Sequence, residues 1–160
     1  MSIFTNDIIW YQFLMICIDW LGTPYKHFKM EKGYGADCAL FIASCLKELG
    51  VLNKICYKYY DRFWHRVTTY EVILDHIAGS ISEHLNKEYE FKKLDKKTDL
   101  TRGDLMTFSL RSKVTNHIAI YLGNKLILNS INGRGVCIMP LSNIYKNRTT
   151  NIFRIINNGN

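Results

Sequence analysis

The chain has 160 residues, carries a formal net charge of +7, and is 48% hydrophobic. This length and apolar content predict a single domain (residues 1–160) with its own core, and neither an internal repeat nor a low-complexity tract is visible. The five cysteines contain no close CxxC pair, which argues against a metal site or a disulfide framework and favours synthesis in a reducing cytosol.

An apolar run at residues 8–21 predicts the first core helix, with Thr5 or Asn6 as its N-cap. Asp7 and Asp19 bracket this run, and it is shorter than the roughly 20 residues that a membrane span needs. The run therefore predicts neither a transmembrane segment nor a signal peptide. We expect a chain made in the cytoplasm that reaches an external substrate after lysis, on a particle, or by a dedicated export device.

A glycine-rich turn at residues 33–36 leads into a second predicted helix, which Cys38 opens. Asp37 is a good N-cap, and Gly50 suits the position just after the helix end. A thiol in the first turn lies at the positive end of the helix dipole, which favours the thiolate and hence attack on a carbonyl. The structural alternative is that Cys38 is a small buried hydrophobic residue.

The segment 51–98 interleaves aromatic and basic residues, and a helix is expected within it. The inward-facing residues of that helix would be Val72, Ile73, Ile77, Ile81 and Leu85. Interleaved aromatic and basic side chains can stack on bases, but no RNA- or DNA-binding motif accompanies them, so we do not expect nucleic acid as a partner. The segment is interpreted as a wall of the substrate groove or as packing beneath a loop.

Four short β-rich stretches separated by Gly and Asn predict successive antiparallel strands at residues 103–110, 117–123, 125–130 and 135–141. A three-residue loop centred on Gly123 would place His117 directly opposite Asn129. A two-residue turn would instead place Ser130 opposite His117, because a slip of one residue reverses the faces. The sequence leaves both registers open.

Together, Cys38, His117 and Asn129 supply the nucleophile, base and base-orienting group of a thiol hydrolase. Four blocks in one order resemble the NlpC-type papain-like cysteine peptidases of bacterial cell-wall turnover: WLGTPY at 20–25, Asp37-Cys38, GDL at 103–105 and HIAIYLG at 117–123. The resemblance covers roughly residues 10–50 and 99–142. Within the family, the chain is most similar to members encoded with phage tails and gene-transfer-agent particles.

The resemblance implies an α+β papain-like fold, with N-terminal helices packed on a central antiparallel β-sheet. It implies Cys38 as nucleophile, His117 as base and Asn129 as the third catalytic residue, with Tyr25 and Asp37 in substrate binding. The expected activity is a cysteine peptidase without cofactor that hydrolyses peptidoglycan stem peptides at the bond between D-glutamate and the diamino acid. A phage-tail-like particle is a further expected partner.

Two positions depart from the common family pattern. Ala39 stands where many members have serine, so we do not expect recognition of a free peptide amine. Asn129 stands where many have histidine, and its amide oxygen can still orient an imidazole, so activity is expected. Two other functions stay open: a non-catalytic tail-assembly or wall-binding module, and a thiol amidase or deamidase acting on a protein.

Overall fold

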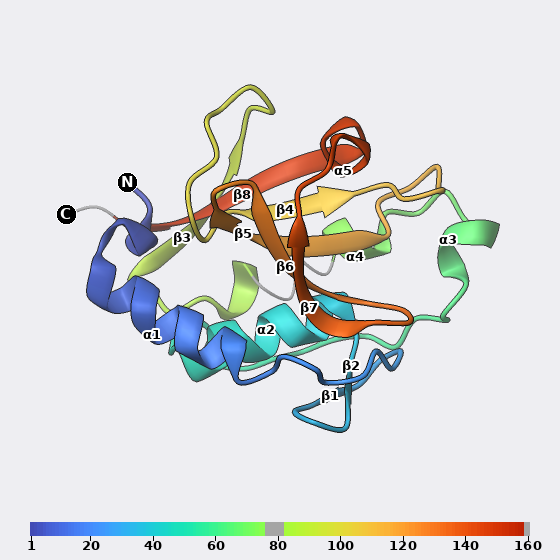
Figure 1. Cartoon of the computed structure of the whole chain (residues 1–160), viewed down its shortest axis with the longest axis horizontal. Coiled ribbons are helices and arrows are strands. Elements are labelled where there is room, and N and C mark those ends of the chain that lie inside the picture. The colour runs from blue at the N-terminus through green and yellow to red at the C-terminus, as the bar shows by residue number, and fades with distance from the viewer. Residues whose placement is uncertain (76–81, 159–160) are drawn as a thin grey trace.

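The computed structural model of the chain describes residues 1–75 and 82–158 (Figure 1). The N-terminal elements are η1 (Ile3–Thr5), α1 (Asp7–Ile18), β1 (Met30–Glu31), β2 (Gly35–Ala36) and α2 (Cys38–Glu48). The middle elements are α3 (Trp64–Val67), α4 (Val72–Asp75), η3 (Ser82–His84) and β3 (Tyr89–Leu94). The last elements are β4 (Leu105–Phe108), β5 (His117–Gly123), β6 (Leu126–Ile131), β7 (Gly135–Pro140), α5 (Asn143–Asn147) and β8 (Thr149–Asn157).

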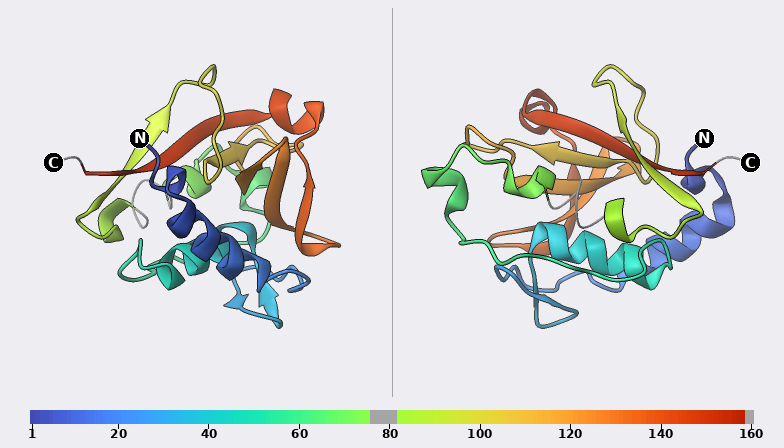
Figure 2. Two further views of the ribbon diagram at one scale, coloured as in Figure 1. Left: turned by 60° about the vertical axis from the view of Figure 1, so that its left-hand side comes forward. Right: turned by 180° about the vertical axis from the view of Figure 1, so that it is seen from behind.

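Six strands form an antiparallel sheet in the order β3-β8-β4-β5-β6-β7. Helix α2 packs against β5 and β6, and α1 packs beside α2 (Figures 1 and 2). Alternate side chains of the strands point to the face of the sheet away from α2. There Phe108 of β4 belongs to a second hydrophobic cluster, which Tyr145 of α5 joins. The α+β class with helices on an antiparallel sheet is therefore confirmed, and the four strands expected between residues 103 and 141 are present as β4 to β7.

Helix α1 is the first core helix that the sequence predicts. Its N-cap is Asn6, whose side-chain oxygen accepts hydrogen bonds from the N–H groups of Ile8 and Ile9. The helix buries Trp10 and Phe13 against the rest of the core. Across residues 1–75 and 82–158, no helix combines the length and the apolar character that crossing a membrane requires.

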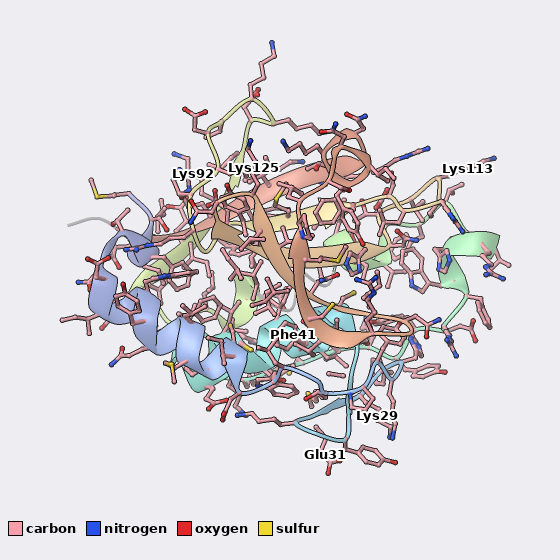
Figure 3. All side chains as sticks on the ribbon, viewed as in Figure 1. Lys29, Glu31, Phe41, Lys92, Lys113 and Lys125 are labelled. Carbon is pink, nitrogen blue, oxygen red and sulfur yellow. The ribbon has the colours of Figure 1, made fainter. Side chains whose placement is uncertain are left out.

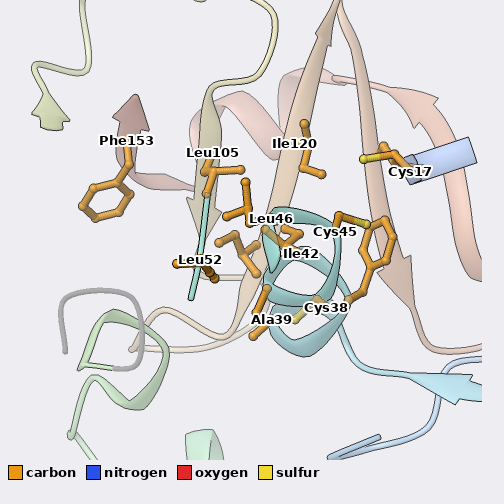
Figure 4. Close-up of a cluster of buried hydrophobic side chains, with 14 of the residues drawn as sticks. Cys17, Cys38, Ala39, Ile42, Cys45, Leu46, Leu52, Leu105, Ile120 and Phe153 are labelled. Carbon is orange, nitrogen blue, oxygen red and sulfur yellow. The ribbon is translucent and has the colours of Figure 1, made fainter. Parts of the chain in front are cut away.

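Helix α2 lies at the centre of the core. Ile42 and Leu46 of this helix pack with Leu105 of β4 and Ile120 of β5, and all four side chains are fully buried (Figure 4). Burying each such side chain contributes about 1.5–3 kcal/mol to stability. This packing fixes the orientation of the helix, and with it the position of Cys38 at its first turn.

Only part of the helix expected within the segment 51–98 lies in the described residues. Helix α4 covers only Val72–Asp75, and the expected inward residues Ile77 and Ile81 lie outside the described residues. Further along the segment, β3 pairs with β8, and Phe91 stacks on Phe153 with ring centroids 5.0 Å apart. Neither strand was predicted, because each is stabilised by a partner from a distant part of the chain rather than by a local turn.

Strand β7 forms one edge of the sheet, and the loop before β1 covers part of it. The N–H of Gly22 donates to the carbonyl of Val136 at 2.9 Å, and the N–H of Val136 donates to the carbonyl of Thr23 at 2.8 Å. Gly135 has a φ of +70°, and a Cβ there would overlap the carbonyl oxygen of Thr23. The close approach that this glycine permits holds the loop carrying Tyr25 against the sheet.

Candidate active site

Cys38 is the first residue of α2, and its sulfur lies beside the backbone N–H of Ile118, the second residue of β5. Gly33, with a φ of +78°, turns the chain ahead of this helix. Asp37 caps the helix by accepting a hydrogen bond from the N–H of Leu40 at 2.8 Å. The turn, cap and packing of α2 thus place the thiol against the start of β5, where Cys38 is 6% exposed.

Asp37 is held by the protein itself. Besides the cap, its carboxylate accepts hydrogen bonds from the N–H of Phe28 at 3.0 Å and from the hydroxyl of Tyr60 at 2.9 Å. The residue is 1% exposed, and burial raises the pKa of its carboxyl group although these hydrogen bonds act in the opposite direction. Asp37 therefore positions the chain around Cys38, and its burial limits access of a substrate amine to the carboxylate.

His117, the first residue of β5, lies in hydrogen-bond contact with Asn129 of β6. The His117 Nε2 to Asn129 Oδ1 distance is 2.8 Å, and the Asn129 Nδ2 donates to the carbonyl of Cys137 at 3.2 Å. Because the amide nitrogen is used by Cys137, the amide oxygen faces the imidazole, so Nε2 carries the hydrogen and donates it. Nδ1 is left with a lone pair, and the ring is flanked by Phe108 and Tyr145 with centroids 6.0 and 6.1 Å away.

The β5–β6 turn differs from both turns considered from the sequence. Asn124 and Lys125 are its central residues, with φ values of +49° and +58°. Positive φ at both central residues gives the turn whose twist matches antiparallel strands. At the end of β5, just before this turn, the strand has a bulge between Tyr121 and Gly123. Both predictions are therefore wrong, the three-residue loop centred on Gly123 and the two-residue turn at Gly123 and Asn124. The turn lies one residue further along the chain, because Lys125 adopts a left-handed conformation that its residue type seldom takes.

Beyond the bulge, Ile120 pairs with Leu128, so His117 lies diagonally across from Asn129 rather than directly opposite. The two residues still share a face, because the shift from direct pairing is two positions. Ser130, the alternative partner, points to the opposite face. The hydrogen bond to His117 is therefore made by Asn129 across a diagonal of the sheet.

Burial, rather than the helix dipole, dominates the protonation of the thiol. Burial and the neighbouring Asp37 raise the pKa of Cys38 to about 12, although backbone N–H groups, including that of Ile118, favour the thiolate. This corrects the expectation of a lowered thiol pKa. Burial also lowers the pKa of His117 to about 4, with the Asn129 hydrogen bond acting in the opposite direction. The resting pair is a neutral thiol and a neutral imidazole.

Tyr25 lies close to the same thiol. Its backbone bridges to Ala36, the last residue of β2. Burial raises the pKa of the Tyr25 hydroxyl, and Cys38 and Asp37 raise it further. The structure thus brings the two residues expected in substrate binding to the N-terminal end of α2, Tyr25 half-buried and Asp37 fully buried.

Two contacts at this site were not predicted from the sequence. The Ser130 hydroxyl donates to the carbonyl of Ala36 at 2.7 Å, and Tyr60 holds the carboxylate of Asp37. The sequence indicates Ser130 only as an alternative partner for His117, and Tyr60 belongs to a segment without family resemblance. No local pattern indicates either contact, since each joins residues far apart in the chain.

Of the remaining cysteines, Cys137 is in contact with the site, through the hydrogen bond from Asn129 to its carbonyl. Cys17 and Cys45 are buried in the core where α1 meets α2 (Figure 4), Cys56 is exposed, and Cys137 is half-buried. All five thiols, including Cys38, are free. Within the described residues, no group of three or more His, Cys, Asp and Glu side chains could hold a metal ion.

The model of the NlpC/P60 family matches residues 22–154 of the chain. No curated protein matches it. Among solved structures, an NlpC/P60 family protein from Bacillus cereus is 23% identical with a TM-score of 0.60, over 89% of this chain and 38% of that one. The NlpC/p60 domain of the peptidoglycan hydrolase SagA is 18% identical with a TM-score of 0.54, over 89% and 95%.

RipD from Mycobacterium tuberculosis, a non-catalytic NlpC/p60 domain protein adapted to peptidoglycan binding, is 15% identical with a TM-score of 0.56, over 91% and 95%. The chain spans about two fifths of the length of the Bacillus cereus protein. At these identities the structural likeness establishes the fold. Because the family model covers most of its length, the chain belongs to the NlpC/P60 family.

Proposed function

We propose that the chain is a cysteine peptidase that hydrolyses peptidoglycan stem peptides. The observation that carries this proposal is the hydrogen bond between His117 Nε2 and Asn129 Oδ1, which leaves Nδ1 free to accept a proton. Cys38, at the N-terminus of the helix packed on the same strand, is the proposed nucleophile. Membership in a family that includes a peptidoglycan hydrolase supports the substrate class.

In the first step, the sulfur of Cys38 attacks the carbonyl carbon of the peptide while the thiol proton passes to Nδ1 of His117. Transfer in step with attack suits this site, because neither the isolated thiolate nor the isolated imidazolium is favoured there. As His117 becomes positive, the oxygen of Asn129 stabilises the imidazolium by accepting its Nε2 hydrogen.

In the next steps, the tetrahedral intermediate collapses, the C–N bond breaks, and the leaving amine takes the proton from His117. Water, deprotonated by His117, then hydrolyses the thioester on Cys38 and restores the thiol. The backbone N–H of Cys38, at the start of α2, is the proposed oxyanion donor, with the hydroxyl of Tyr25 as a second donor.

The proposed bond is that between D-glutamate and the diamino acid, in a stem peptide still attached to glycan. The net charge of +7 favours such an acidic substrate. Ala39 offers no hydroxyl, and Asp37 is buried with three internal hydrogen bonds, so neither favours a free peptide amine. These features support a polymeric rather than a recycled, amine-ended substrate.

The proposed place of action is the cell wall, reached after lysis, on a particle or by a dedicated export device. The Gly22–Tyr25 block and Ala39, which resemble the phage-tail members, favour delivery on a particle. Mass spectrometry of purified particles and of culture supernatant tests this: the protein should be found in the particle fraction, and its absence there would contradict particle delivery.

A second candidate function is binding to peptidoglycan without catalysis. Cys38 is 6% exposed and its thiol pKa is raised to about 12, which favours an unreactive thiol. RipD is a member of this kind. In that case the protein would sediment with purified sacculi without producing new muropeptides.

Mass spectrometry of muropeptides after incubation with sacculi tests the peptidase. The wild-type protein should produce fragments ending in D-glutamate, and Cys38→Ala should produce none. Alanine is the best helix former, so this variant should keep its fold, which circular dichroism checks. Intact muropeptides with the wild-type protein, or cleavage by Cys38→Ala, would contradict the proposal.

A further inference from the structure

A cavity of about 630 Å³ lies between the end of α3 and the loop that joins β4 to β5. Three cationic side chains line it, Arg66, Arg111 and Lys113, together with His65, whose pKa is lowered by burial and by Arg66. None of the described residues that line it is acidic. Figure 3 shows Lys113 projecting beside α3, and Figure 1 and the right-hand view of Figure 2 show this loop next to α3. The cavity is therefore positive and open to an anion.

Two hydroxyl groups in its lining are arranged as donors. The oxygen of Thr68 already accepts a hydrogen bond from the N–H of Tyr70 at 3.0 Å, and that of Ser112 accepts one from the N–H of Val114 at 3.1 Å. Each hydroxyl can still donate its own hydrogen into the cavity. The lining thus combines guanidinium, ammonium and hydroxyl donors, the groups that bind an anionic oxygen.

One wall of the cavity is connected to Cys38. Tyr60, which holds the carboxylate of Asp37, packs edge-on against Trp64 at the start of α3, with ring centroids 6.5 Å apart. Arg66 lies over the ring of Phe63, with its guanidinium carbon 4.8 Å from the centroid. A chain of contacts therefore connects Asp37, the residue before Cys38, through Tyr60 and Trp64 to α3, which carries the cationic lining.

The other wall is connected to His117. Arg111 and Lys113 lie in the loop that ends where His117 opens β5. The carboxylate of Glu71, the residue before α4, accepts a hydrogen bond from the N–H of Thr115 at 3.0 Å and so ties the segment after α3 to the β4–β5 loop. Both walls of the cavity are thus connected through the fold to the proposed catalytic site, one through Asp37 and the other through the start of β5.

We propose that this cavity is a substrate subsite that binds a carboxylate of the stem peptide, an inference that rests on the proposed peptidase function. The planar fork of a guanidinium matches a carboxylate with two parallel hydrogen bonds, and the cavity presents two such groups, on Arg66 and Arg111. A stem peptide carries carboxylates on D-glutamate and on the diamino acid, and both present the same chemistry to the cavity.

The test uses Arg66→Gln with Arg111→Gln, each of which removes a charge while keeping much of the side-chain length. Lys92→Gln is the matched control, because this exposed lysine lies at the other end of the molecule from Lys113 (Figure 3). Stem peptides are compared with each carboxylate free or converted to an amide, one at a time. Binding is measured by calorimetry in the Cys38→Ala background, and kcat/KM in the active protein.

The wild-type lining should favour one free carboxylate over its amide by about tenfold or more in both measurements, as expected for a hydrogen bond to a charged group. The double variant should lose this preference, and Lys92→Gln should keep it. The carboxylate whose conversion to an amide weakens binding is the one that the cavity binds, and it belongs either to D-glutamate or to the diamino acid.

A wild-type protein indifferent to every amide, or a double variant that keeps the preference, would overturn the subsite. Loss of binding to poly(glycerol phosphate) in the double variant, with peptide binding unchanged, would overturn it in favour of a phosphate polymer. Cleavage without carboxylate preference would leave the peptidase standing and reject the subsite. Carboxylate-dependent binding without cleavage would keep the subsite and reject the peptidase, whereas no peptide binding at all would reject both.

Discussion

The hydroxyl of Ser130 donates a 2.7 Å hydrogen bond to the carbonyl of Ala36, two residues before Cys38. Its neighbour Asn129, facing the other side of β6, holds the imidazole of His117. Two consecutive residues of one strand therefore position the proposed base and the backbone that leads into the proposed nucleophile. This relationship makes β6 the element on which the alignment of the site depends.

Ser130→Ala should lower the free energy of unfolding by about 1–2 kcal/mol, because it removes a buried hydrogen bond. Turnover should fall less than in Asn129→Ala, since the Ala36 carbonyl also accepts a hydrogen bond from the N–H of Lys26. Chemical denaturation and muropeptide assays measure the two effects. A stable Ser130→Ala protein with no activity would show that the serine takes part in the chemistry.

Asn129→Ala should reduce turnover by about 10- to 1,000-fold, because the imidazole loses the acceptor that fixes its orientation. Asn129→His offers a ring nitrogen in place of the amide oxygen and should retain more activity than the alanine variant. Steady-state kinetics on one stem peptide compare the two variants. Equal activity of wild type and Asn129→Ala would remove Asn129 from the catalytic residues.

The pH dependence of stability should report the buried His117. Its pKa is about 4 in the folded protein, below the ordinary value of 6.5, so only the unfolded chain binds a proton between these values. Stability should therefore be complete above about pH 6.5 and should decline by about 3 kcal/mol as the pH falls to about 4.

Chemical denaturation of wild type and His117→Gln over this pH range isolates the contribution of His117 to the free energy of unfolding. Glutamine does not titrate, and the contributions of the other groups cancel when the two proteins are compared. The variant should lose less stability than the wild type on acidification. Parallel curves would mean that the imidazole is accessible to protons in the folded state.

Iodoacetamide should label Cys38 slowly at pH 7, because the thiol is 6% exposed and its pKa is about 12. The experiment needs a Cys56→Ser background, since Cys56 is exposed and would react first. A peptide aldehyde that occupies the site should react much faster, with His117 taking the proton during attack, and His117→Ala should abolish this advantage. Rapid iodoacetamide labelling at pH 5–6 would instead indicate a stable thiolate.

The parts of the site that could be predicted from the sequence depend on local signals. Asp37 as a cap and Cys38 as the first helical residue follow from a few neighbouring residues, and the structure has both. Short β-rich stretches separated by Gly and Asn likewise predict β4 to β7, whereas the face shared by His117 and Asn129 depends on the loop between the two strands.

The rest depends on contacts between distant residues. The register of β5 and β6 is set by a bulge and by Lys125 in a left-handed conformation, which its residue type does not indicate. The pairing of β3 with β8 and the contact of Tyr60 with Asp37 require the folded chain. The raised pKa of Cys38 follows from burial, which a helix position alone does not reveal.

The loop that pairs Gly22 and Thr23 with Val136 affects whether another molecule can pair with this edge of the sheet. Backbone groups on an open sheet edge can recruit a strand from a neighbouring molecule, and here those of Val136 are already occupied. The opposite edge, β3, carries exposed Lys92 and Lys93, whose charges repel a second copy. Both edges of the sheet are thereby protected against pairing with a strand of another molecule.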